Sequence, residues 1–148
     1  MPHSRLEDLP NGYDRWPAIG DNGFRSTQWG DMEVGYTTVH APLDCTEAYK
    51  FGRLPGGVCP CPHYGYIFEG RMRAKYPGSD WPDEVIEAGE AYFIPSGHVL
   101  VYEEPSKVLE LNPAHALQMC MDAMQTAIVA MQAQGVDAAP KPAEEPAA

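Results

Sequence analysis

The sequence is poor in basic residues and has no long apolar run. Only 10 lysines and arginines stand against 21 aspartates and glutamates, which gives a formal net charge of −11. A surface of this sign repels the phosphates of nucleic acids and of anionic lipids, so we expect neither as a partner. No stretch of about 18 apolar residues, the length that indicates a membrane-spanning helix, is present.

We also expect no secretory leader, and cysteine is scarce. The first residues, MPHSRLEDLPNGYDRW, lack the basic segment followed by an apolar one that is typical of a signal peptide. We therefore expect a cytoplasmic protein. In that compartment the four cysteines, Cys45, Cys59, Cys61 and Cys120, stay reduced.

Short strands and turns dominate what is present. The 148 residues are enough for one domain, and 15 prolines and 14 glycines punctuate the chain. Strand-like segments rich in Val, Thr, Tyr and Phe recur between turn clusters. They are residues 32–41, 48–54, 64–76, 84–95, 97–104 and 107–112, with 48–54 the weakest. This spacing predicts an all-β sandwich or barrel.

Three further segments flank the predicted strands. Residues 1–31 show no clear period and are expected to be an N-terminal arm that packs through its aromatic side chains. Residues 113–135 carry an apolar face at helical spacing, with Asn112 as the expected cap, and predict a C-terminal α-helix. The tail, residues 136–148, is rich in Pro, Ala and Glu and is expected to be disordered.

Two motifs between residues 57 and 104 resemble those of the cupin superfamily. In the first, the segment HYGYIFEG ends on Gly70, so that His63 takes the glutamate position and Gly57 and Cys59 take the two histidine positions. In the second, GEAYFIPSG fits the start of the motif. Its histidine position falls on Leu100 and its asparagine position on Glu104, while a histidine stands two residues earlier, at His98.

The resemblance is closest to small single-domain bacterial cupins with PHxGY and IPxGH motifs. It implies a cupin-type double-stranded β-helix, or jelly-roll barrel, over residues 32–112, with an N-terminal arm and a C-terminal α-helix. The superfamily includes metal-dependent oxygenases, isomerases and lyases as well as ligand-binding modules. The resemblance therefore implies a fold and leaves the activity open.

Strand alternation suggests which side chains face the barrel interior. If His63 points inward, Ile67 does too, while Tyr64, Tyr66 and Phe68 point outward. His98 shares a face with Leu100 and Tyr102.

His63 and His98 are then expected to meet near one end of the barrel and to hold a divalent metal, Zn, Fe, Ni or Cu. Cys59 and Cys61 are further candidate ligands, although the prolines beside them disturb strand alternation. His40 and Glu69 are alternatives. The structural interpretation is that the histidines only satisfy hydrogen bonds and the cysteines act as small apolar side chains.

Further residues are candidates for binding and catalysis. Tyr36, Thr38 and His40 share one face of the first strand and are expected to line a pocket for a small, partly aromatic or carboxylic molecule. Arg71 could hold a carboxylate, unless it lies on a solvated face. Glu69 or Tyr102 could move a proton.

Three hypotheses follow: a metal-dependent cupin enzyme, a metal-free ligand-binding or sensing module, and an accessory protein that works through its helix and aromatic face. A homodimer is expected in each case.

Overall fold

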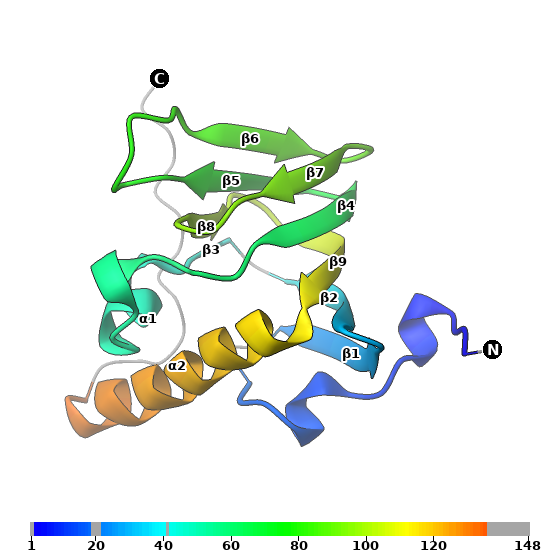
Figure 1. Cartoon of the computed structure of the whole chain (residues 1–148), viewed down its shortest axis with the longest axis horizontal. Coiled ribbons are helices and arrows are strands. Elements are labelled where there is room, and N and C mark those ends of the chain that lie inside the picture. Colours follow the sequence, from blue (N-terminus) through cyan, green and yellow to red (C-terminus); the bar gives the residue numbers. More distant parts are fainter. Residues whose placement is uncertain (1, 19–21, 41, 136–148) are drawn as a thin grey trace.

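Two antiparallel sheets face each other in the computed structural model, which describes residues 2–18, 22–40 and 42–135 (Figure 1). The larger sheet has the strand order β1-β2-β9-β4-β7. Its strands are β1 (Gly23–Trp29), β2 (Met32–Val39), β9 (Ser106–Pro113), β4 (His63–Glu69) and β7 (Ala91–Ile94). The smaller sheet has the order β3-β8-β5-β6. Its strands are β3 (Leu43–Asp44), β8 (Val99–Tyr102), β5 (Arg71–Lys75) and β6 (Glu84–Glu87).

Helices close one side of this sandwich. The short helix α1 (Thr46–Phe51) and the 3-10 turn η3 (Pro55–Gly57) connect β3 to β4, and α2 (Ala114–Ala133) follows β9 directly. Two further 3-10 turns, η1 (Leu6–Asp8) and η2 (Gly12–Asp14), lie in the segment before β1. In Figure 1, α2 runs below the sheets, between α1 and the N-terminal segment.

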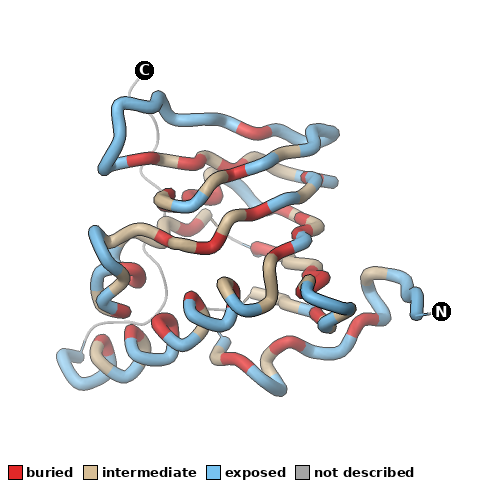
Figure 2. The backbone as a smooth tube through the Cα atoms, viewed as in Figure 1, coloured by how far each residue is buried: buried red, intermediate tan, exposed pale blue. Residues whose placement is uncertain are grey.

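The core between the sheets is apolar. Ile67, Met72, Ile94 and Val108 are fully buried, one or more from each sheet. Burial of such a side chain stabilises the fold by about 1.5–3 kcal/mol. A second apolar cluster joins α1, α2 and the N-terminal segment to the residues around Cys59. Along α2, buried and exposed residues alternate (Figure 2), which shows that the apolar face of the helix packs on its own domain.

Gly70 forms the tight connection between β4 and β5. Its φ of +91° is in the region that favours glycine. An added Cβ would also lie 2.1 Å from Oγ of Ser106, which is too close for a real contact. Glycine is therefore required at this position by both conformation and space.

The alternation predicted for β4 is confirmed. His63 and Ile67 are buried, while Tyr64, Tyr66 and Phe68 are exposed. The predicted strand-like segment 84–95 forms two strands, β6 and β7, and the predicted C-terminal helix is present as α2.

The sequence predicted a strand over residues 48–54, and this prediction is wrong. The helix α1 occupies the first part of this segment, up to Phe51. The Asp44 side chain accepts a hydrogen bond from the backbone N–H of Thr46 at 2.8 Å, and Glu47 and Lys50 stand at the ends that suit the helix dipole. These helix signals outweigh the strand preference of Tyr49 and Phe51.

The N-terminal segment is more ordered than an arm without secondary structure. Residues 23–29 form β1 and pair along their whole length with β2. The prediction that residues 136–148 are disordered lies outside the described residues. Within the described residues, no helix is both long and apolar enough to span a membrane.

Candidate metal centre and cavity

His63 and His98 meet at one end of the barrel, as strand alternation predicted. His63 is the first residue of β4, and His98 directly precedes β8. Their ring centroids are 4.7 Å apart in an edge-on arrangement. An antiparallel bridge between Cys59 and His98 aligns the lead-in to β4 with the lead-in to β8. Two histidines 35 positions apart in the sequence are therefore adjacent because both strands begin at the same end.

His98 is held as a neutral imidazole. It is fully buried, and its Nδ1 donates a hydrogen bond to the carbonyl oxygen of Pro95 at 2.7 Å. Burial, together with the nearby His63, lowers the pKa of His98 to about 4. Because Nδ1 carries the proton, Nε2 presents a lone pair, and no residue in the described part of the chain hydrogen bonds to it.

His63 is oriented by β9. Its Nδ1 donates to Oδ1 of Asn112 at 2.8 Å, and Oε2 of Glu110 is 3.6 Å from the same nitrogen. Its Nε2 faces Sγ of Cys59 at 3.8 Å. A hydrogen bond that fixes one ring nitrogen leaves the other as a ligand, which is the usual arrangement of metal-binding histidines.

Cys59, His63 and His98 together form a set of metal donors. One donor atom from each lies within 4.8 Å of the others, and all three residues are buried. Two imidazoles and a thiolate suit zinc or another borderline-soft metal. The unpartnered Nε2 of His98 is the sign that these residues fit a metal ion, because a buried polar atom without a partner is costly.

A second thiol, to which the sequence assigned no role, joins this cluster. Sγ of Cys120, on α2, is 3.0 Å from Sγ of Cys59. Hydrogen bonds from the thiols of Cys59 and Cys61 lower the pKa of Cys120, while the same interactions and burial raise the pKa values of Cys59 and Cys61. The cluster therefore favours one thiolate, stabilised by its neighbours. Cys61 is buried, and its Sγ contacts the carbonyl oxygen of Pro62 at 3.3 Å.

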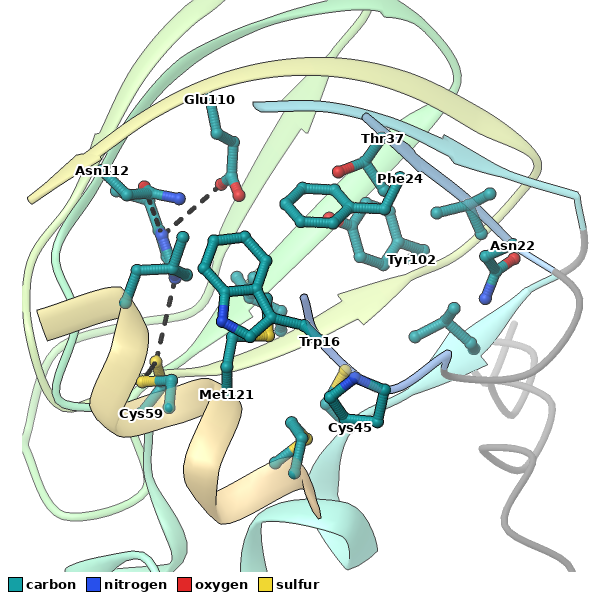
Figure 3. A pocket seen from close by; sticks show the side chains of 18 of the residues that line it. Trp16, Asn22, Phe24, Thr37, Cys45, Cys59, Tyr102, Glu110, Asn112 and Met121 are labelled. Carbon is teal, nitrogen blue, oxygen red and sulfur yellow. Dashed lines mark hydrogen bonds and ion pairs between the residues drawn. The ribbon is translucent and has the colours of Figure 1, made fainter. Parts of the chain in front are cut away.

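A cavity of about 160 Å³ adjoins the cluster. Figure 3 shows Trp16, Phe24, Tyr102 and Glu110 gathered around it. The remaining wall is mostly apolar and comes from the N-terminal segment, from α1 and α2, and from the strands β2, β3, β4, β8 and β9. It includes Thr37, Val39, Leu43, Cys45, Tyr49, Leu100, Asn112, Leu117, Met121 and Met124, besides Cys59, His63 and Cys120. Trp16 is fixed over the cavity by a hydrogen bond from its Nε1 to Gln118 at 3.1 Å.

The prediction that Tyr36, Thr38 and His40 line the interior is wrong. Thr37 and Val39 line the cavity instead, Tyr36 packs against Phe68 on the outer face, and His40 is exposed. Side chains on a strand alternate, so an error of one residue exchanges the two faces. Glu33 stands at the same parity as Thr37 and Val39 and is buried, with its charge paired with Arg15 and hydrogen bonded by Ser26.

Glu69 and Arg71 also lie away from the cavity. Glu69 is exposed and forms an ion pair with Lys107 at 3.6 Å. Arg71 pairs with Glu103 and Glu104 of its own chain at 3.6 and 3.9 Å. Neither residue is part of the cavity wall.

Tyr102 does line the cavity, and its hydroxyl is kept protonated. Burial, followed by the charge of Glu110, raises its pKa well above the ordinary value. Glu110 itself accepts a hydrogen bond from the hydroxyl of Tyr92 at 2.9 Å. Sequence reasoning missed Glu110 and Asn112, although both stand at alternate positions of the predicted strand 107–112 and could have been placed on its inner face.

Comparisons with known proteins point to the fold. No protein-family model matches the sequence, and no curated protein is similar enough to count as a relative. Among solved structures, the polyketide cyclase RemF from Streptomyces resistomycificus superposes with a TM-score of 0.51 and 20% identity, over 77% of this chain and 80% of RemF. The EutQ protein of Clostridium difficile superposes with a TM-score of 0.50 and 12% identity, over 76% of this chain and 86% of EutQ.

A third structure, described as a cupin-2 domain protein from Shewanella frigidimarina, has a TM-score of 0.42 and 15% identity over 68% of this chain and 87% of that one. The two packed antiparallel sheets and the likeness to the first two structures confirm the predicted all-β, cupin-type jelly-roll fold.

Proposed function

We propose that this protein is a small cupin that binds a small organic molecule in its cavity, beside a divalent metal held by His63, His98 and Cys59. The observation that carries the proposal is the buried, unpartnered Nε2 of His98, which belongs to a cluster whose donor atoms lie within 4.8 Å of one another. Zinc is the metal that this donor set favours, because it accepts both imidazole and thiolate. The four free cysteines suit a reducing compartment such as the cytoplasm.

Three protein ligands are the number found in catalytic zinc sites. When bound, such a metal supplies Lewis-acid polarisation of a carbonyl or carboxylate. This is the chemistry of the isomerase and lyase classes, and an oxygenase would need iron or copper in the same place.

Residues of the chain would bind the substrate and move protons. Trp16 and Phe24 offer aromatic surface for a planar substrate. Tyr102 keeps its proton and can donate a hydrogen bond. Glu110 replaces Glu69 as the candidate proton carrier, because it lines the cavity and lies 3.6 Å from Nδ1 of His63.

Metal content tests this proposal. Untagged full-length protein is dialysed against zinc and then against buffer. Inductively coupled plasma mass spectrometry should then find about one zinc ion per chain. His63→Ala and His98→Ala should each remove the bound zinc, Cys59→Ser should weaken it, and Cys61→Ser should change it little. His40→Ala is the matched control, since His40 is exposed. Wild-type protein that retains no zinc, iron, nickel or copper would contradict the metal site.

The apolar character of the cavity favours one alternative, a metal-free ligand-binding or sensing module. Most of its wall is aromatic or aliphatic, with a few polar groups such as Glu110, Asn112 and Thr37. Such a wall binds small molecules without a metal. Native mass spectrometry of protein treated with a chelator distinguishes the two: a retained small molecule in the absence of metal supports the module.

A second copy of the chain is the proposed macromolecular partner, and the outer face of the larger sheet is its proposed contact. Tyr64, Tyr66, Phe68, Phe93 and Leu111 are between 37% and 52% exposed there. They lie on β4, β7 and β9, and the strand register places Tyr64 beside both Phe93 and Leu111. These five side chains carry no charge, so two copies that each carry a net charge of −11 can approach through them with less repulsion than through the acidic surface.

A further inference from the structure

Two of the cysteines form a close pair in the wall of the cavity. Cys59 precedes β4 and Cys120 lies on α2, 61 positions later, yet their Sγ atoms are 3.0 Å apart. Both residues line the cavity, so a small reagent in the cavity can reach them. A disulfide bond of about 2.05 Å needs the two sulfurs to approach by about 1 Å more.

The other two thiols are placed differently. Cys61 also hydrogen bonds with Cys120, but its Sγ contacts the carbonyl oxygen of Pro62 at 3.3 Å and it is not part of the cavity wall, so a reagent in the cavity does not reach it. Cys45 lines the cavity, but its side chain hydrogen bonds with Tyr49 and not with another thiol. The geometry thus distinguishes Cys59 and Cys120 from the remaining cysteines.

We propose that Cys59 and Cys120 are a peroxide-sensitive dithiol. Hydrogen peroxide converts the two thiols to a disulfide, and the disulfide withdraws Cys59 from the metal site. One thiolate attacks a peroxide oxygen, the O–O bond breaks, and hydroxide leaves, which forms a sulfenic acid. The second thiolate attacks that sulfur and displaces hydroxide, which takes up a proton to form water. In total, two thiols and one hydrogen peroxide give one disulfide and two waters.

The consequence for the metal follows from the shared residue and rests on the proposed function. Sulfur in a disulfide is no longer a thiolate, and the thiolate is the form that binds metal. After oxidation, only two of the three proposed ligands, His63 and His98, would remain. A small thiol reductant reverses the step by thiol–disulfide exchange.

Peptide mapping tests the dithiol itself, independently of metal. Full-length, metal-free protein is treated with equimolar hydrogen peroxide, denatured, alkylated and digested with trypsin. We expect one disulfide joining the peptide that contains Cys59 to the peptide that contains Cys120, with Cys45 alkylated. Cys59 and Cys61 share one tryptic peptide, since no Lys or Arg stands between Arg53 and Arg71. Cys61→Ser therefore serves as the matched variant, and it should form the same link.

The loss of the link in Cys61→Ser, a dominant link to Cys45, or thiols that all survive the treatment would overturn the dithiol. Cys120→Ser should form no link between these two peptides, and a folded circular dichroism spectrum shows that this variant is still intact.

Zinc release tests the consequence. In zinc-loaded wild-type protein, a chromophoric chelator should report zinc release in step with disulfide formation, and dithiothreitol should restore uptake. Cys120→Ser should release zinc at least about tenfold more slowly, because its Cys59 has no partner for a disulfide. Equal rates in the two proteins would refute the coupling. If wild-type protein binds no zinc at all, the metal site fails, and the peptide mapping still decides the dithiol.

Discussion

Asn112 acts on the site through His63. Its Oδ1 accepts the Nδ1 proton of His63, which leaves Nε2 free to face Cys59. In Asn112→Ala this tautomer and ring orientation are no longer fixed, and we expect zinc affinity to fall roughly 10- to 100-fold. Competition with a chelating dye measures the change.

Asn112→Asp keeps an acceptor at the same position and is the matched variant for this residue. Its zinc affinity should stay closer to that of wild-type protein. An alanine variant with unchanged affinity would mean that the contact with Asn112 does not position His63.

His98 makes the stability of the metal-free protein depend on pH. Its pKa is about 4 in the folded state, against 6.5 in an unfolded chain. Between these values the unfolded state binds a proton that the folded state does not, so the free energy of unfolding falls as the pH falls from about 6.5 to about 4. Between pH 7 and pH 5 the free energy of unfolding falls by roughly 2 kcal/mol, because pH 5 lies about 1.5 pH units below the pKa of histidine in the unfolded chain.

Urea denaturation of chelator-treated protein at the two pH values measures this loss. His98→Gln lacks the titrating group, and its decrease in stability over the same interval should be smaller by that amount. Parallel decreases in the two proteins would show that other groups cause the acid sensitivity.

At the scale of elements, α2 shapes the site by its position on α1. Gly52 ends α1 and lies so close to α2 that an added Cβ would be 2.5 Å from the carbonyl oxygen of Ala123. Its φ of −74° suits any residue, so only space requires glycine here. This contact helps to hold α2, and with it Cys120, against the barrel.

Gly52→Ala should therefore destabilise the protein by roughly 1–3 kcal/mol, the cost of overpacking a close contact. Thermal unfolding measures it. Gly78→Ala is the control, because nothing lies within 4 Å of an added Cβ there, and its stability should change little. Equal stability of the two variants would mean that α2 can shift away from α1 without cost.

At the scale of the whole molecule, the two apolar surfaces expected from the sequence are mostly used inside the chain. Leu117, Met124 and Met131 of α2 are buried against their own domain, and the aromatic residues of the N-terminal segment cover the cavity. Of the nine exposed large apolar residues in the described part of the chain, five lie instead on β4, β7 and β9. The proposed homodimer therefore depends on the sheet face.

Light scattering at micromolar concentration should give about 33 kDa, twice the mass of the 16.3 kDa chain. Tyr66→Glu should shift the protein to the monomer, since it places like charges in the contact of two copies. Val129→Glu is the control, because Val129 is 58% exposed on α2, away from the sheet face. A wild-type monomer would contradict the dimer, and a monomeric Val129→Glu would place the interface on the helix.

The sequence by itself determined the features that depend on local pattern. Alternation along residues 63–68 placed His63 inside and three aromatic residues outside, and turn residues such as Gly70 and Gly89 separated the strands correctly. The positions of His63 and His98 at the starts of two strands were enough to predict that they meet. These properties depend on a period of two residues and on backbone conformation, which neighbouring residues set.

Only the tertiary structure decided which distant residues complete the site. Cys120 reaches Cys59 because α2 docks across the open end of the barrel, and no local period encodes that docking. The inner face of β2 was assigned to Tyr36, Thr38 and His40, whereas the structure buries Glu33 at the alternate positions, with partners from β1 and the N-terminal segment. A charged residue can lie inside when distant groups compensate its charge, and those partners become visible only once the chain has folded.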